Sequence, residues 1–258
     1  MDRRRRLGLT VSVVAAVLLS GCSSSTVSPT VEGADLRPAE MSGCPGDLAR
    51  LVDSAAVPTA ETVLALDFSG SFISTDAARA RMHAQVRSLV QQSVESSQAL
   101  RILAFTRTAS GAFTIVTCPS LAPRYNNEAA RSRKVENLKR KAAAAVDVAL
   151  DAAIRTQLRQ RAGRGTSIVG GFLAIEESAP LVRAGIPRDA VMFSDGQGLD
   201  EEVPVDLSAF RSVSLYGVGA SAGESMGTQA ADAAAKGWVH WLAEHGANRP
   251  NASTQAMF

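Results

Sequence analysis

The sequence predicts a three-layer α/β domain, in which a mostly parallel β-sheet carries helices on both faces. Runs of five to seven largely apolar residues, the length of a buried strand, alternate along the chain with longer amphipathic stretches. These runs are nearly continuously apolar, as expected for strands covered on both sides. The chain has 258 residues, 46% of them hydrophobic, which suffices for one sizeable core and excludes disorder.

The alternation predicts five strands and four helices. The expected strands are Val63–Phe68, Leu100–Thr106, Ala112–Thr117, Ala190–Ser194 and Val213–Val218. A Ser-Gly turn between the second and third of these predicts a hairpin. The expected helices are Asp76–Ser96, Asn127–Gln160, Ile168–Arg183 and Thr228–Glu244. After Gly219 no sixth strand is recognisable, and the chain passes into the last helix.

The first 21 residues are typical of a signal peptide. Arg3–Arg6 are cationic, and Leu7–Leu19 form an apolar run of 13 residues. A helix of that length spans only ~20 Å, which is short for a ~30 Å hydrocarbon layer. The segment Leu19–Cys22 (LSGC) resembles the bacterial lipobox, in which the cysteine becomes the lipidated first residue of the mature chain. We therefore expect lipidation at Cys22 and removal of residues 1–21; ordinary secretory cleavage is the alternative.

The remainder divides into three parts. Residues 22–45 are rich in Ser, Pro, Gly and Thr, which predicts a flexible tether behind the lipidated cysteine. Residues 46–248 would form the folded domain, and residues 249–258 a C-terminal tail. We expect the domain to be held at the extracytoplasmic face of the cell membrane. Because disulfides persist outside the cytoplasm, Cys44 and Cys118 are predicted to pair.

Three loops carry oxygen-bearing side chains at places where the sheet would present them together. Asp67, Ser69 and Ser71 follow the first strand, Thr166 precedes the third helix, and Asp195 follows the fourth strand. Ligands of open α/β sheets bind at the carboxyl ends of strands. Carboxylates and hydroxyls without His or Cys favour a hard cation, namely Mg²⁺, Mn²⁺ or Ca²⁺, over zinc. Alternatively, the two aspartates only shape their loops, and Thr166 caps the helix.

The D-x-S-x-S loop, the later Gly-Thr-Ser and the strand-borne Ser-Asp-Gly resemble the metal-ion-dependent adhesion site (MIDAS) of von Willebrand factor A (vWA) domains. The resemblance covers Glu61 to Glu244, including the strand Leu215–Gly219, and implies a Rossmann-like fold. It further implies that the hydroxyls of Ser69, Ser71 and Thr166 ligate the ion directly, while Asp67 and Asp195 act mainly through waters. The missing sixth strand and the long helical segment before Gly165 depart from the family pattern.

The resemblance implies metal-dependent protein binding, in which a carboxylate of a protein partner completes the ion's coordination. We expect no enzyme, because no nucleophile–base pair is readable beside the loops. Gly219–Gly223 matches the G-x-S-x-G pattern of serine hydrolases, with Ser221 as the nucleophile, but only 35 residues follow Gly223, too few for the rest of a triad fold. A structural envelope module with a non-functional metal site is the other alternative. A net charge of +2 and 5% aromatic residues argue against nucleic-acid binding.

The long second helix carries a run of basic residues: Arg131, Arg133, Lys134, Lys139, Arg140 and Lys141. On the same helix, Leu138, Ala142, Val146, Leu150, Ile154 and Leu158 recur every four residues and would face the core. The basic residues are therefore expected on the solvated face. A second interpretation is that they contact anionic lipid headgroups or cell-wall polymers.

Overall fold

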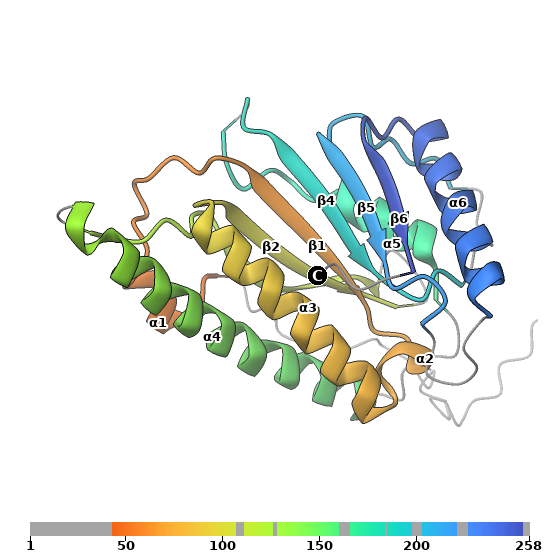
Figure 1. Cartoon of the computed structure of the whole chain (residues 1–258), viewed down its shortest axis with the longest axis horizontal. Coiled ribbons are helices and arrows are strands. Elements are labelled where there is room, and N and C mark those ends of the chain that lie inside the picture. Colours follow the sequence, from red (N-terminus) through yellow and green to blue (C-terminus); the bar gives the residue numbers. More distant parts are fainter. Residues whose placement is uncertain are drawn as a thin grey trace, which may run out of the picture. The chain divides into compact units, whose positions relative to one another are not determined.

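A six-stranded sheet in the order β3-β2-β1-β4-β5-β6 forms the centre of the computed structural model (Figure 1). Its strands are β1 (Glu61–Asp67), β2 (Ala99–Phe105), β3 (Phe113–Cys118), β4 (Arg188–Phe193), β5 (Ser212–Tyr216) and β6 (Pro250–Ser253). All neighbours pair in parallel except β2 and β3, which form the expected antiparallel hairpin. The structure describes residues 43–106, 111–125, 128–159, 166–183, 185–197, 203–220 and 227–254.

Helices cover both faces of the sheet, so the predicted three-layer α/β fold is confirmed. The helices are α1 (Gly46–Ala49), α2 (Gly70–Ile73), α3 (Asp76–Glu95), α4 (Arg131–Arg159), α5 (Ile168–Glu176) and α6 (Thr228–Glu244), with a 3-10 turn, η2, at Glu128–Ala130. One core joins α3 and α4 to alternate residues of the strands, such as Leu64 and Leu66. The other joins α5 and α6 to the residues between them, such as Val63 and Ala65.

Three details differ from the sequence-based expectation. A sixth strand exists: β6 lies within the range expected to be a tail and pairs in parallel with β5. Helix α5 ends at Glu176 instead of Arg183, because Pro180 disfavours helical geometry just before it. The ridge along α4 is buried from Leu138 to Ile154 as predicted, but Leu158 is 42% exposed.

Strands β1 and β4 lie side by side at the switch point of the sheet. From β1 the chain continues to β2 on one side, while β4 lies on the other. Both strands end at the same edge, with Leu66 paired to Phe193. The segments that follow them, starting at Phe68 and Ser194, therefore emerge next to each other. This is the position at which open α/β sheets bind ligands.

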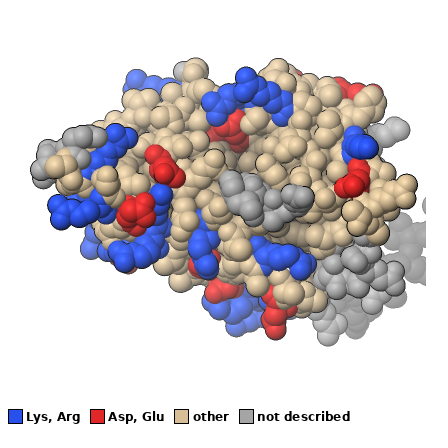
Figure 2. All heavy atoms as spheres, viewed as in Figure 1, with Lys and Arg blue, Asp and Glu red and all other residues tan. Residues whose placement is uncertain are grey.

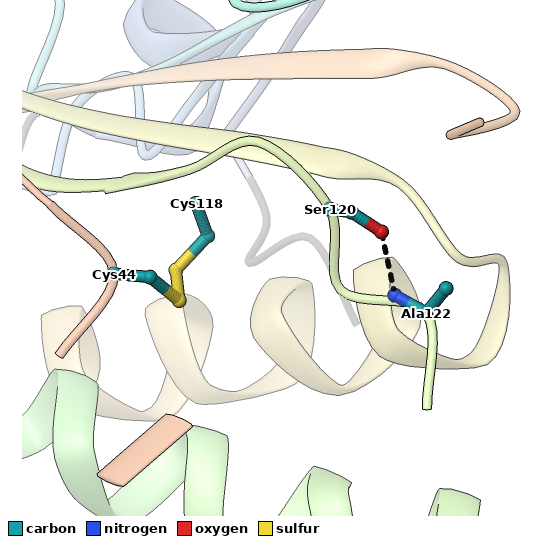
Figure 3. Close-up of a disulfide and its surroundings, with 4 residues drawn as sticks. All are labelled: Cys44, Cys118, Ser120 and Ala122. Carbon is teal, nitrogen blue, oxygen red and sulfur yellow. Dashed lines mark hydrogen bonds between the residues drawn. A yellow bond between two sulfur atoms is a disulfide. The ribbon is translucent and has the colours of Figure 1, made fainter. Parts of the chain in front are cut away.

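The opposite edge of the sheet carries the predicted disulfide. Cys44 and Cys118 are bonded, with their Cα atoms 4.5 Å apart, so this prediction is confirmed (Figure 3). Cys118 ends β3 and lies opposite Leu100, at the start of β2. The bond therefore fixes the beginning of the described chain to the amino-terminal edge of the sheet. Among the described helices, none is both long and apolar enough to cross a membrane.

Candidate metal site

Asp67 is the centre of the candidate site. It ends β1 and is completely buried. Its Oδ1 atom accepts a hydrogen bond from the backbone N–H of Ser69 at 2.8 Å, and its Oδ2 atom accepts one from the Ser194 hydroxyl at 2.7 Å. The first hydrogen bond closes a local turn between Asp67 and Ser69, as Asp side chains commonly do. The second connects the end of β1 to the end of β4. The carboxylate is thus held in a fixed orientation between the two loops.

The predicted ligand from the second loop also reaches this carboxylate. The Thr166 hydroxyl donates to Asp67 Oδ1 at 3.3 Å, across 99 positions of sequence. Thr166 does not cap the next helix: Ser167 does, by accepting from the Gly170 N–H at 2.9 Å. The alternative in which Thr166 is only a helix cap is therefore wrong.

The two serines of the first loop lie at the start of α2. Ser69 is buried and is the N-cap residue of this short helix. Ser71 lies within α2, but its side chain is outside the described part of the structure. The backbone thus brings this loop to the same strand end as Thr166.

Asp195 lies directly after β4 and is 2% exposed. Its Oδ1 accepts from the Gln197 N–H at 3.0 Å, and its carbonyl accepts from the Gly219 N–H at 2.7 Å, which ties the loop to the segment after β5. Gly196 has φ +74°, and a Cβ there would lie 3.0 Å from Val218. Only glycine fits this left-handed, crowded position without strain.

Two side chains that support the loops were not recognised from the sequence as parts of the site. The Ser194 hydroxyl links the loops after β1 and β4, since it donates to Asp67 and accepts from the Gly196 N–H at 3.3 Å. The indole Nε1–H of buried Trp238 donates to the Gly196 carbonyl at 3.1 Å. The position of Ser194 beside Asp195 was a signal for the first, whereas nothing in the sequence connects Trp238 with Gly196.

Burial raises the pKa of Asp67 from 3.8 to about 6. The hydrogen bonds from Ser194 and Ser69 oppose this shift, and the nearby charge of Asp195 adds to it. Two buried carboxylates in one place need a positive charge to be stable together when ionised. The side-chain atoms available as metal ligands are all oxygens, which hard divalent cations prefer. These residues therefore fit such an ion.

In the part of the chain that the structure describes, no group of three or more His, Cys, Asp or Glu residues is arranged to hold a metal ion. An ion here would therefore depend on two carboxylates supplemented by hydroxyls. Two residues singled out in the sequence, Cys22 and Ser221, lie outside the described residues.

No family model matches the chain, and no curated protein matches it significantly. Among solved structures, it is similar to a von Willebrand factor type A protein from Catenulispora acidiphila, with a TM-score of 0.40 and 16% identity over 62% of this chain and 33% of that one. It is similar to BatB from Bacteroides thetaiotaomicron, with a TM-score of 0.36 and 19% identity over 62% and 67% of the two chains. A third is the PilB minor pilin from Streptococcus sanguinis, with a TM-score of 0.40 and 10% identity over 79% and 59%.

Proposed function

We propose that this protein is a lipid-anchored, extracytoplasmic vWA-like binding module. Asp67, Ser69, Ser71, Thr166 and Asp195 would hold a divalent cation, Mg²⁺ or alternatively Mn²⁺ or Ca²⁺. The ion would bind an acidic group of a protein partner. The function is binding and not catalysis.

The observation that carries the proposal is the convergence on Asp67. Its buried carboxylate accepts hydrogen bonds from Thr166 and Ser194, which are 99 and 127 positions away in the sequence. Asp195, also buried, adds a second carboxylate at the neighbouring strand end. Loop-forming aspartates without a ligand are normally exposed, as Asp206 is in the same kind of turn with the Ser208 N–H.

The chemistry follows from the mixture of ligands. Three of the proposed ligands are neutral hydroxyls, so the bound ion keeps part of its charge and can attract one more anionic oxygen. Backbone hydrogen bonds hold the three loops in place: the Phe68 N–H donates to the Phe105 carbonyl, the Ser167 N–H to the Thr106 carbonyl, and the Gly219 N–H to the Asp195 carbonyl. A carboxylate on a partner protein is the group of matching charge and hardness.

Calorimetry with Mg²⁺ and Mn²⁺ tests the metal site. The wild-type chain should bind one ion, and the double variant Asp67→Asn with Asp195→Asn should bind none. Asp206→Asn, which removes one carboxylate from an exposed turn of the same kind, is the control and should bind normally. Equal binding by the wild type and the double variant would refute the site.

The lipid anchor is supported by the Leu19–Cys22 sequence and is compatible with the Cys44–Cys118 disulfide, since disulfides persist in oxidising compartments. Mass spectrometry of the protein from a bacterial host that lipidates should find acyl groups on Cys22. The variant Cys22→Ser should partition into water instead of detergent. A protein that remains water-soluble with Cys22 intact would contradict the anchor.

A further inference from the structure

We infer that the edge of the domain opposite the candidate metal site docks on anionic membrane lipid, with a basic cavity receiving a headgroup phosphate. The cavity has a volume of about 290 Å³ and lies between the loop after β3 and the start of α4. Its charged lining residues are Arg50, Arg124 and Lys134, and no Asp or Glu is among the described residues that line it. An anion is therefore the ligand that its charge favours.

The three cations are held together by the local fold. Arg50 follows α1, and Arg124 is positioned by its backbone N–H, which donates to the Leu51 carbonyl at 3.0 Å. Lys134 lies in the first turn of α4. All three are exposed, and within the described residues none of them makes an ion pair. This differs from Lys139 farther along α4, which is engaged by Glu136 and Glu95.

Apolar side chains accompany this charge. Tyr125 lines the cavity and is 38% exposed. Val57 is 76% exposed and lies in the loop before β1. A hydrogen bond from the Thr59 N–H to the Ser97 carbonyl holds this loop at the amino-terminal edge of the sheet. Tyrosine with cations and an exposed aliphatic residue is a combination suited to the interface between headgroups and acyl chains.

The place where the predicted tether would join the domain favours membrane lipid as the ligand of the cavity. The disulfide fixes Cys44 to the end of β3, and the loop that follows leads directly to Pro123 and Arg124 in the cavity wall. About 20 residues separate Cys22 from Gly43 in the sequence. If they form the tether that their composition predicts, a Gly/Ser-type linker of that length would have an r.m.s. span of about 25 Å. If Cys22 is acylated, the bilayer is held next to this edge, and its headgroups have a high effective concentration there.

Figure 2 shows Lys and Arg gathered around the end of the molecule where α4 begins. Asp67 and Asp195 lie at the other edge of the sheet, at the ends of β1 and β4. Docking through the basic edge would therefore turn the candidate metal site away from the bilayer, toward partners. This orientation rests on the proposed function, whereas lipid binding by the cavity does not.

Vesicle co-sedimentation tests the inference on the chain from residue 22 with Cys22→Ser, which contains every described element. A chelator is present throughout, so metal binding plays no part. The protein should bind vesicles containing phosphatidylglycerol and not vesicles of phosphatidylcholine alone, and binding should weaken as salt is raised. The triple variant Arg50→Gln, Arg124→Gln and Lys134→Gln should bind about a hundredfold more weakly, since each cation near an anionic surface contributes about fivefold.

The matched control is Arg155→Gln, Arg159→Gln and Lys236→Gln, which removes the same charge from exposed positions away from the cavity. It should lose far less binding. Equal losses of vesicle binding in the two triple variants would refute the cavity as the lipid-binding site. Equal binding of the wild type to both kinds of vesicle would refute it as well. Binding to an isolated anionic wall polymer but not to vesicles would overturn the lipid as the occupant. Failure of metal binding in the separate calorimetry would leave all these outcomes unaffected.

Discussion

Asp67 is the residue on which three segments of the chain converge. It is fully buried, and its carboxylate is surrounded by donors from three separate segments: Ser69, Thr166 and Ser194. The donors stabilise the ionised form, but they do not fully compensate for the loss of water, and so the pKa is raised to about 6. A cation supplied from outside would remove the remaining cost. The ionised carboxylate would therefore be more stable in a metal-bound than in a metal-free protein.

The raised pKa predicts an unusual dependence of stability on pH. A carboxyl whose pKa is about 6 when folded and 3.8 when unfolded keeps its proton better in the folded state. Its contribution to stability is fully present below pH 3.8 and is lost as the pH rises through about 6. Between pH 4 and pH 7 this one group should lower the free energy of unfolding of the metal-free protein by about 2 kcal/mol.

Urea denaturation in the presence of chelator measures this effect. The free energy of unfolding should fall between pH 4 and pH 7 by about 2 kcal/mol less in Asp67→Asn than in the wild type, because asparagine cannot ionise. Asp206 is the control: its pKa is lowered by the Ser208 backbone hydrogen bond, so it stays ionised across this range, and Asp206→Asn should keep the wild-type slope. The same slope in Asp67→Asn as in the wild type would contradict the role of burial at Asp67.

Trp238→Phe tests the support of the β4 loop. The substitution keeps most of the buried ring but removes the donor to the Gly196 carbonyl, so the free energy of unfolding should fall by about 1–3 kcal/mol. The loop carrying Asp195 would lose a fixed contact, so Mg²⁺ affinity measured by calorimetry should also fall. Trp241→Phe, on the less buried part of the same helix face, is the comparison. An unchanged Mg²⁺ affinity in Trp238→Phe would show that the indole only packs.

At the scale of the element, the sequence predicts strands and helices well where burial produces a pattern. β1 is buried throughout, and its centre, Val63–Leu66, is continuously apolar. α4 repeats its buried residues every four positions, as the two-sided core requires. β6 has no such pattern: Pro250–Ser253 contains a proline and an asparagine, which an edge strand tolerates because one side of it makes no ladder bonds. The link from Trp238 to Gly196 arises from packing between distant segments, and no local pattern encodes it.

Helix α5 illustrates how close packing of an element positions the site. A Cβ at Gly171 would lie 2.8 Å from Met192 Cε and 2.9 Å from the Phe105 ring, so α5 lies unusually near the sheet. Gly171→Ala should push the helix outward and destabilise the fold by about 1–3 kcal/mol, measured by denaturation. Because Thr166 lies just before α5, Mg²⁺ affinity should fall too.

Gly237 provides the matched control for this helix. It lies inside α6, and a Cβ there would meet nothing within 4 Å. Gly237→Ala should therefore stabilise the protein by about 0.5–1 kcal/mol through helix propensity alone. If both alanine variants were stabilised, the close approach of α5 to the sheet would be refuted.

At the scale of the whole molecule, the two edges of the sheet carry different groups of residues. The carboxyl edge collects Asp67 and Asp195, whereas the amino edge holds the disulfide and the basic cavity. The polar residues at the strand ends predicted the grouping at the carboxyl edge, whereas the features of the amino edge were predicted only in part. It named Cys44, Cys118 and the basic start of α4. The meeting of Arg50 and Arg124 with Lys134 depends on the fold of three segments and could not be read from their spacing.

This separation predicts that the disulfide can be removed without loss of metal binding. The bond closes a loop across 74 positions, and its chain-entropy contribution is about 4 kcal/mol. The double variant Cys44→Ala with Cys118→Ala should therefore unfold at clearly lower urea concentration. At low urea its Mg²⁺ affinity, measured by calorimetry, should equal that of the wild type, because the bond lies at the edge of the sheet farthest from Asp67. A large loss of affinity in the folded variant would show that the two edges are coupled, and the division of the molecule into a membrane-facing and a partner-facing edge would then fail.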